Sequence, residues 1–185
     1  DTGVTPFNFK REMLATLPNL RAFAVSLTNN RHSADDLVQD TIMKAWARQE
    51  TFSPGTNMKA WLFTILRNEF YSQMRKRGRE IADAEGRLTE QMATHPEQYG
   101  SMDMADFRSA LDKLPEDQRE AIVLVGASGF SYEEAAEISG CAVGTIKSRV
   151  SRARSALQNL LAVDNYTEFG PDRDSAKVTT KAFVR

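Results

Sequence analysis

Basic side chains recur at helical spacing in one stretch of the sequence, and they suit contacts with phosphates and base edges. Every charged residue between 143 and 160 is cationic, and short hydroxyl residues lie between the cations. Lys and Arg bind DNA phosphates and guanine acceptor atoms, and Ser and Thr can bond to either. This pattern predicts a nucleic-acid contact surface made of Thr145, Lys147, Ser148, Arg149, Ser151, Arg152 and Arg154.

Two helices joined by a tight turn are expected to position these side chains. Ser131 and Glu134 have the spacing of a capping box, which marks a helix start. Gly140 can adopt the left-handed conformation that a tight corner requires. After it, apolar residues three and four apart predict one buried stripe of a longer helix: Val143, Ile146, Val150, Ala153 and Leu157. The pattern is typical of a helix-turn-helix whose second helix enters a DNA major groove.

A helical hairpin with a solvated face is the alternative interpretation. Solvated faces normally mix both signs of charge. Here the acids Glu133, Glu134 and Glu137 lie on the first helix and the cations on the second. This separation favours DNA binding.

Composition restricts the remaining classes of function. The 185 residues fit one domain or two small ones, and 41% hydrophobic content is ordinary for a globular protein. Because the formal net charge is −1, nucleic-acid binding must come from local patches. The single cysteine, Cys141, excludes an internal disulfide and a cysteine-cluster metal site.

We expect no enzyme activity, cofactor, metal or small-molecule substrate. The sequence shows no nucleophile–base set, metal-ligand cluster or phosphate-binding glycine loop. It also shows no apolar run of membrane-spanning length and no signal-peptide pattern, so we expect no membrane partner and a cytoplasmic location.

The first half of the sequence predicts helices with a possible partner-binding face. Residues 8–28 have a helical pattern in which Pro18 is expected to start a second piece. Ser33 is expected to start the next helix, with Trp46 among its inward residues. The opposite face of this helix carries Asp36, Gln39, Asp40 and Lys44. A carboxylate pair at i, i+4 is mildly unfavourable, so this face is either a partner-binding surface or a helix start favoured by the dipole.

A loop at 52–57 precedes a helix that ends in a basic run at 75–79. Trp61, like Trp46, is assigned to the core. Aromatic residues interleave with cations along this helix, a combination that suits unstacked bases and a phosphate track. The alternative is a core helix whose cationic end is merely solvated. The residues concerned are Lys59, Phe63, Arg67, Phe70, Tyr71, Arg75, Lys76, Arg77 and Arg79.

The predicted fold class is all-α, with two small helical domains joined by a flexible acidic linker. The domains are expected at 8–79 and 107–162, and the linker at 80–106, which holds seven acids against one base. Pro115 is expected to open a helix of the second domain, and the tail at 163–185 is expected to be frayed.

Four motifs in this order resemble group IV, or extracytoplasmic-function (ECF), RNA polymerase sigma factors: DDLVQDTIMKAWA, FSPGTNMKAWLFTILRN, MRKRGR and VGTIKSRVSRAR. Three stretches, PNLRAFAVSLTNN, PGTNMKAWLFTILRNEFYSQMRK and LPEDQREAIVLVGASGFSYEEAAEISGC, are similar to the EcfG-type general-stress members. The resemblance covers roughly residues 8–160 and implies sigma region 2 in the first domain and region 4 in the second.

The resemblance also implies partners and site residues. Region 2 would bind the β′ clamp helices of core polymerase through Asp36, Gln39, Asp40 and Lys44, and region 4 would read the −35 element with the 143–154 face and dock on the β flap. Region 2 would also melt the −10 element and capture a base. Its −10 residues would be Phe52, Thr56, Asn57, Lys59, Phe63, Arg67, Asn68, Arg75, Lys76 and Arg77. An anti-sigma factor would hold an EcfG-type protein inactive.

Two other functions remain possible at this point. A sigma-like mimic would titrate an anti-sigma factor without binding DNA, but the intact basic faces at 75–79 and 147–154 speak against it. A dimeric transcription regulator would need a dimerisation or ligand-sensing region, for which the acidic linker is a poor candidate.

Overall fold

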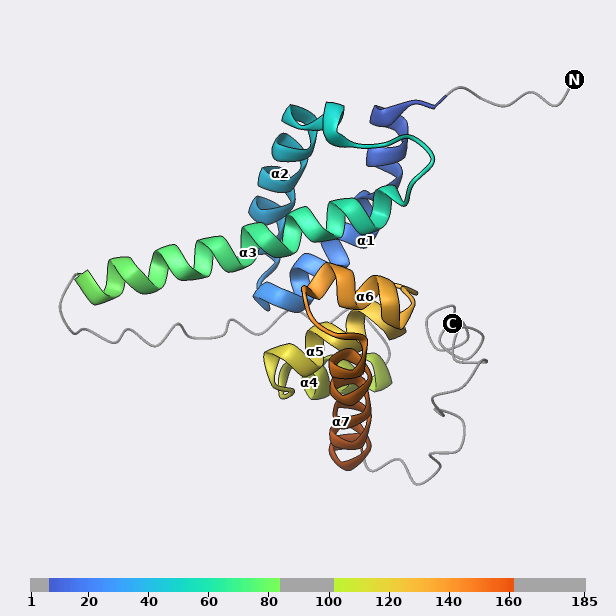
Figure 1. Cartoon of the computed structure of the whole chain (residues 1–185). Helices are drawn as coiled ribbons and strands as arrows, with labels where there is room; N and C mark the ends of the chain where they lie inside the picture. Colours follow the sequence, from blue (N-terminus) through green and yellow to red (C-terminus); the bar gives the residue numbers. More distant parts are fainter. Residues whose placement is uncertain (1–6, 84–101, 162–185) are drawn as a thin grey trace, which may run out of the picture. The chain divides into compact units, whose positions relative to one another are not determined.

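The computed structural model describes residues 7–83 and 102–161, and all the secondary structure in these ranges is helical (Figure 1). The chain divides into two compact units, Asp1–Thr94 and His95–Arg185. The predicted all-α class with two helical domains is therefore confirmed. The predicted flexibility of the linker and fraying of the tail fall on 84–101 and 162–185, outside the described residues.

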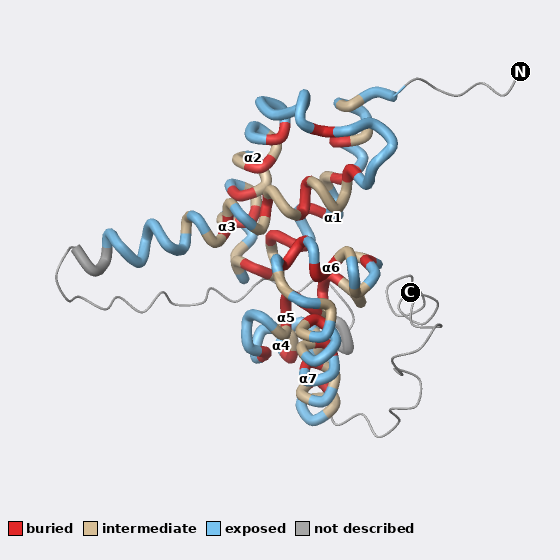
Figure 2. Tube along the Cα trace, in the orientation of Figure 1, coloured by how far each residue is buried: buried red, intermediate tan, exposed pale blue. Residues whose placement is uncertain are grey.

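The first unit consists of three mutually packed helices. These are α1 (Phe9–Thr28), α2 (Arg31–Ala47) and α3 (Met58–Asp83), with a short 3₁₀ turn, η1 (Gln49–Thr51), after α2. Apolar side chains from all three helices are removed from water, and this burial drives the packing. Figure 2 shows buried residues in the first part of α3 and exposed residues in its far part. The large, fully buried side chains of this unit include Leu20, Phe23, Leu37, Leu62, Phe63 and Leu66.

The junction of α1 and α2 differs from the prediction. Helix α2 begins at Arg31, not at Ser33, because the Asn30 side chain accepts a hydrogen bond from the Ser33 backbone N–H and caps the helix. The preceding Asn29 adopts the left-handed conformation, with φ of 52°, and ends α1. Two adjacent asparagines thus end one helix and start the next.

The prediction that Pro18 starts a second helical piece is wrong, because α1 continues through it. Proline has no N–H to bond the carbonyl of Leu14, four residues earlier. Both residues are exposed, so water can satisfy that carbonyl. Buried Met13, Leu20 and Phe23 hold the helix on both sides of the proline.

The assignment of Trp46 to the core is also wrong, because this residue is 45% exposed. The buried stripe of α2 runs through Leu37, Thr41 and Ala45. Trp46 follows Ala45 and is therefore rotated by about 100° away from that stripe. Trp61 is partly buried.

The second unit is built around its last helix. Helix α7 (Val143–Leu161) packs against α4 (Met102–Asp112), α5 (Glu116–Ile122) and α6 (Tyr132–Ser139). One cluster of its core joins Ala110 and Leu114 to Ala153 and Leu157 of α7. A π-helical turn, η2 (Val123–Ala127), follows α5, where Ser128 N–H donates to the Val123 carbonyl at 2.8 Å.

Both helices that border the predicted linker are longer than expected. Helix α3 continues to Asp83 and α4 starts at Met102, so each extends into 80–106. None of the described helices combines the length and apolar character needed to cross a membrane.

Candidate nucleic-acid interface

The turn between α6 and α7 has the predicted geometry. Ser131 Oγ accepts from Glu134 N–H at 3.1 Å, and Glu134 Oε2 accepts from Ser131 N–H at 2.9 Å, so the capping box is confirmed. Gly140 has φ of 64°, the left-handed conformation expected at the corner. Cys141 N–H donates to the Ala136 carbonyl at 3.1 Å, which ends α6 and directs the chain into α7.

Helix α7 buries one stripe and exposes a polar one. Ile146, Val150, Ala153 and Leu157 are buried as predicted, whereas Val143 is only partly buried. Helical geometry places the small residues Gly144, Ser148 and Ser151 on the opposite side. Small side chains let a helix backbone approach a groove closely. Four predicted DNA-contact residues are exposed: Lys147, Ser148, Ser151 and Arg152.

Two cations of α7 contact neighbouring groups. Arg149 Nε lies 3.2 Å from Asp117 Oδ2, and only 25% of the Arg149 side chain is exposed. Lys147 Nζ lies 5.7 Å from the ring centre of Tyr132 on α6, a cation–π contact that leaves its charge unneutralised. Thr145 and Arg154 are partly buried at the flanks of the polar face. Arg149, one of the predicted DNA contacts, is thus paired with Asp117 of α5.

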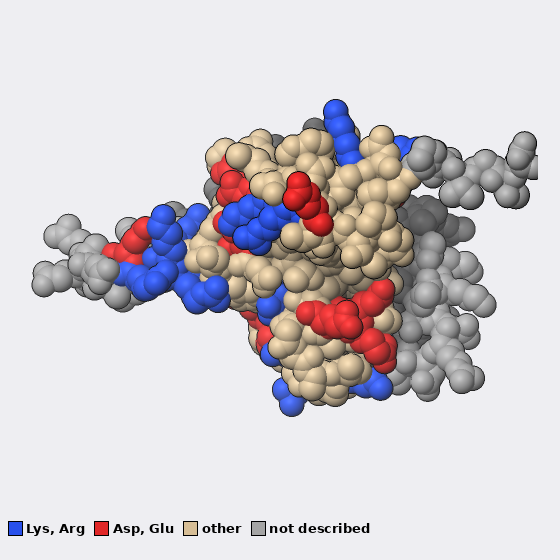
Figure 3. Space-filling model, turned by 45° about the horizontal axis from the view of Figure 1, so that its top comes forward, with Lys and Arg blue, Asp and Glu red and all other residues tan. Residues whose placement is uncertain are grey.

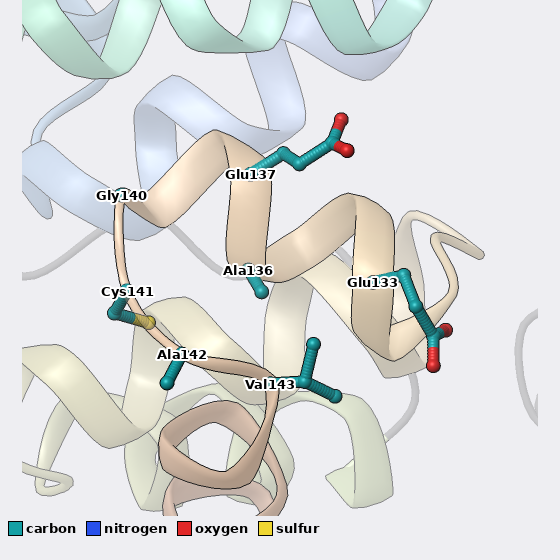
Figure 4. A pocket seen from close by; sticks show the side chains of 7 residues that line it. All are labelled: Glu133, Ala136, Glu137, Gly140, Cys141, Ala142 and Val143. Atoms are coloured by element: carbon teal, nitrogen blue, oxygen red, sulfur yellow. The ribbon is translucent and has the colours of Figure 1, made fainter.

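The acidic side of the helix-turn-helix is separate from this polar face. Glu133 and Glu137 of α6 line a groove with Gly140, Ala142 and Val143 at the turn, and Figure 4 shows both carboxylates pointing away from the ribbon. Carboxylates repel DNA phosphates, so this groove does not belong to the candidate DNA surface.

A second basic surface lies along α3. Arg75, Lys76 and Arg77 are exposed, and Figure 3 shows Lys and Arg side chains gathered along the projecting end of this helix. Closer to the core, the Arg67 guanidinium lies 4.5 Å from the Tyr71 ring centre. Asn68, one residue after Arg67, is exposed. Tyr71 is not among the predicted −10 residues, and its position beside Arg67 makes it a further candidate.

Two predicted DNA contacts are contradicted by burial. Phe63 is 0% exposed and stacks on Phe23, with ring centres 4.7 Å apart. Phe52 is 6% exposed and packs against other rings. Since α3 packs against both α1 and α2, its buried stripe is broad enough to include Phe63. Lys59 is partly buried, with its Nζ 5.8 Å from the Phe63 ring centre.

The loop between η1 and α3 presents a short exposed tip. Gly55 has φ of 90°, and the Ser53 carbonyl accepts from Thr56 N–H at 3.2 Å and from Thr56 Oγ1 at 2.7 Å. Asn57 Oδ1 accepts from Ala60 N–H at 3.0 Å and so caps α3. Of the predicted loop contacts, Thr56 therefore lies at the tip, while Asn57 has a structural bond.

The polar face of α2 is connected to α3. Asp36 and Gln39 are exposed, while Asp40 accepts from Gln73 Nε2 at 3.0 Å. Gln73 also donates to Glu69, and Glu69 bonds to Lys44. The hydrogen bond from Lys44 lowers the pKa of Glu69, and the bond from Gln73 adds to this effect, while burial opposes it.

Met43 is a candidate contact that sequence reasoning missed. It is 71% exposed and lies one turn after Gln39 and Asp40 on the same face of α2. A methionine normally indicates core, but this one lies off the stripe of Leu37, Thr41 and Ala45, and that offset was visible in the spacing. Among the described residues, no group of His, Cys, Asp and Glu could hold a metal ion.

Known families match both units. The Sigma-70 region 2 model matches residues 13–80, and the Sigma-70 region 4 model matches residues 104–157. The ECF RNA polymerase sigma factor EcfG of Rhodopseudomonas palustris is 58% identical over 165 residues, which cover 89% of this chain and 91% of the relative.

Two solved structures of sigma factors have the same fold. The sigma factor RpoE of Bartonella quintana, crystallised with the anti-sigma factor NepR, matches with a TM-score of 0.75 and 67% identity over 85% of this chain and 98% of RpoE. CnrH in complex with the cytosolic domain of CnrY matches with a TM-score of 0.61 and 30% identity over 85% of this chain and 89% of CnrH. These matches confirm the resemblance to sigma factors of the EcfG type. The chain belongs to the ECF RNA polymerase sigma factors, which bind core RNA polymerase and direct it to promoter DNA.

Proposed function

We propose that this sigma factor reads the −35 element with α7 and the −10 element with α3 and the 53–57 loop. Region 2 would occupy 8–79, region 4 would occupy 107–162, and 80–106 would connect them. The observation that carries the proposal is the presence of one exposed basic surface on each unit, each opposite a buried stripe.

At −35, the exposed face of α7 is suited to a duplex. Lys147 and Arg152 can reach guanine acceptors or phosphates, and Ser148 and Ser151 allow close approach to the groove. Thr145, Arg149 and Arg154 would contact DNA from the flanks, Arg149 after leaving Asp117.

At −10, the loop tip and the outer face of α3 are suited to a single strand. Extruding a base costs about a few kcal/mol, which stacking and hydrogen bonds in the protein must offset. Thr56 at the tip offers a hydroxyl, and Arg67 and Asn68 offer hydrogen-bond donors on the outer face. Arg75, Lys76 and Arg77 would hold the backbone phosphates. Phe63 is excluded from this set by its burial.

For polymerase, α2 offers an apolar side chain beside carboxylates. We assign Asp36, Gln39, Asp40 and Met43 to the contact with the β′ clamp helices, and region 4 to the β flap. Methionine is enriched at protein interfaces, and complementary charges fix the register. Lys44 contributes through its bond to Glu69.

The relatives suggest how the protein is controlled. RpoE and CnrH were each solved with an inhibitory partner or its domain, and EcfG is the name of a general-stress type. We infer that this chain serves general stress genes, is held by an anti-sigma factor, and acts in the cytoplasm, where the polymerase transcribes. The chemistry of RNA synthesis would belong to the polymerase.

Transcription by purified core polymerase from a stress-type promoter, with and without this chain, tests the proposal. We expect transcript only with the chain, and less with Lys147→Ala or Arg152→Ala. Asn159→Ala, an exposed site near the end of the same helix, is the matched control and should leave transcription unchanged. A chain that supports no transcript but binds an anti-sigma factor tightly would instead be a sigma mimic.

A further inference from the structure

Five aromatic rings meet where the first unit's N-terminal residues, α2, the loop and α3 come together. Phe9 is the centre of this aromatic cluster. Its ring centre lies 6.1 Å from Trp46, 6.0 Å from Phe52 and 5.9 Å from Trp61. Phe7 stacks on Phe52 at 5.7 Å with an interplanar angle of 22°, and Phe52 and Trp61 are 5.2 Å apart.

The rings differ in burial, and the most buried one belongs to the loop. Phe52 is 6% exposed, whereas Phe7 and Trp46 are each 45% exposed. Phe7 therefore covers one side of Phe52 at the surface. Neither Phe7 nor Phe9 lies in residues 13–80, the segment matched by the region 2 model.

The cluster fixes one end of the loop that carries the exposed tip. At that end the Phe52 ring is packed and its N–H donates to the Gln49 carbonyl at 3.1 Å. At the other end, Asn57 caps α3. The tip at 54–56 between these ends is exposed. The position of the tip therefore depends on where these two ends are held. At the Phe52 end, the surrounding aromatic rings determine that position.

We propose that Phe7 and Phe9 are positioning residues for the −10 loop, which hold Phe52 so that the tip at 54–56 is preformed for an unstacked base. This inference rests on the proposed −10 role of the loop. Neither ring needs to contact DNA. A preformed loop does not have to be ordered when the strand binds, so its affinity for the strand is higher.

The test compares Phe7→Ala with Leu14→Ala in the full chain. Phe7 and Leu14 are 45% and 44% exposed, so each substitution removes a similarly exposed apolar side chain, but only Phe7 is in the aromatic cluster. Each variant is assembled with core polymerase and titrated with a non-template single strand carrying the −10 element of a promoter that the wild-type holoenzyme transcribes. Affinity for core polymerase is measured separately.

Loss of one aromatic pair should weaken strand binding about threefold to tenfold in Phe7→Ala. Leu14→Ala should bind like wild type, and Phe7→Tyr, which keeps the ring, should restore binding. Affinity for core polymerase should not change, although a general loss of structure in the first unit would lower it through α2. Wild-type binding by Phe7→Ala, equal losses in Phe7→Ala and Leu14→Ala, or a parallel loss of polymerase affinity would overturn the positioning role.

Tryptophan fluorescence provides a readout of the cluster itself. The chain has two tryptophans, and Trp46 and Trp61 both lie beside Phe9. Phe9→Ala should both change the emission of the tryptophans and weaken strand binding. A changed emission with unchanged binding would refute the proposal that the aromatic cluster positions the tip of the loop. If the wild-type holoenzyme does not bind the single strand at all, the −10 assignment is wrong and the positioning role falls with it.

Discussion

Helices α3 and α7 both carry cations opposite a buried stripe, but their surroundings differ. The exposed side of α7 consists of small polar residues, among them Gly144, Ser148 and Ser151. Beside α3, a loop with a left-handed glycine and an aromatic ring under Arg67 offer an irregular surface. A smooth polar helix suits a duplex groove, and an irregular surface with a partly exposed ring suits unstacked bases.

The two helices also hold their cations differently. Arg149 of α7 is paired with the carboxylate of Asp117, which offsets its charge. Arg67 of α3 lies over the Tyr71 ring, a cation–π contact that positions the guanidinium. The number of cations in a helix therefore overestimates the charge that it offers to DNA. The contrast can be tested by substitutions that affect one unit at a time.

The largest effect is expected from Phe63→Ala in the core of the first unit. Removing a fully buried, stacked ring should lower the free energy of unfolding of this unit by about 3–5 kcal/mol. Tryptophan fluorescence during urea unfolding reports this unit alone, since both tryptophans lie in it. An unchanged transition would mean that Phe63 is on the surface after all.

The matched change in the second unit is Ile146→Ala. This substitution should lower the free energy of unfolding of the second unit by about 2–5 kcal/mol, because Ile146 is 0% exposed on the buried side of α7. Circular dichroism should detect this loss while the tryptophan transition stays unchanged. A shift of the tryptophan transition would show that the two units do not unfold independently.

A smaller effect, on affinity for DNA, should distinguish Arg152 from Arg149 on α7. Arg152→Ala should weaken binding to a −35 duplex by about 1–3 kcal/mol and, if it contacts phosphate, lower the salt slope by about 1. Arg149→Ala should cost less, because Asp117 already holds that guanidinium. Fluorescence anisotropy of holoenzyme on labelled −35 duplex at several salt concentrations measures both. A larger loss in Arg149→Ala would mean that the contact of Arg149 with DNA outweighs the cost of leaving Asp117.

Removing a helix cap should lower the free energy of unfolding by about 1 kcal/mol, and each unit has a cap that can be removed. Asn30→Ala removes the cap of α2 and should lower the tryptophan-detected stability of the first unit. Ser131→Ala removes one half of the capping box of α6 and should lower only the stability of the second. Thermal unfolding followed by both signals measures each change; equal effects of both variants on the tryptophan signal would contradict the assignment.

The helix-turn-helix could be predicted closely from the sequence, whereas the burial of particular side chains in the first unit could not. Ser131, Gly140 and the stripe from Ile146 to Leu157 are local signals, each of which acts within a few residues. Whether Trp46 and Phe63 are buried depends on contacts with other helices, and the spacing of apolar residues along one helix does not reveal those contacts. Phe63 is buried because α3 packs on two helices at once, and Trp46 is exposed because it lies beside the stripe rather than on it.

The same distinction applies to the site residues. The exposure of Lys147 and Arg152 follows from their place opposite the apolar stripe. The pairing of Arg149 with Asp117 joins α7 to α5 across 32 positions of sequence and leaves no local signal. The aromatic cluster likewise joins Phe7 to Phe52, and only the fold brings these rings together.

The smallest expected effect is on stability: the free energy of unfolding should depend on pH with opposite sign in the two units. In the first unit, the hydrogen bond from Lys44 lowers the pKa of Glu69 below its ordinary value of 4.5. In the second, burial raises the pKa of Asp112 above its ordinary value of 3.8, while Arg119 and Arg108 oppose the shift. A lowered pKa means that the unfolded chain binds protons more tightly than the folded one, and a raised pKa means the reverse.

Acidification should therefore weaken the first unit and slightly strengthen the second. The contribution of Glu69 is present above its ordinary pKa and is lost as the pH falls through its folded value. The contribution of Asp112 is present below its ordinary pKa and is lost as the pH rises through its folded value; it is small because the residue is largely exposed. Urea unfolding between neutral pH and about pH 3, followed by tryptophan fluorescence and circular dichroism, measures both. Glu69→Gln should reduce the pH dependence of stability in the first unit, and Asp112→Asn should reduce it in the second. A pH dependence of the same sign in both units would show that other groups dominate the titration.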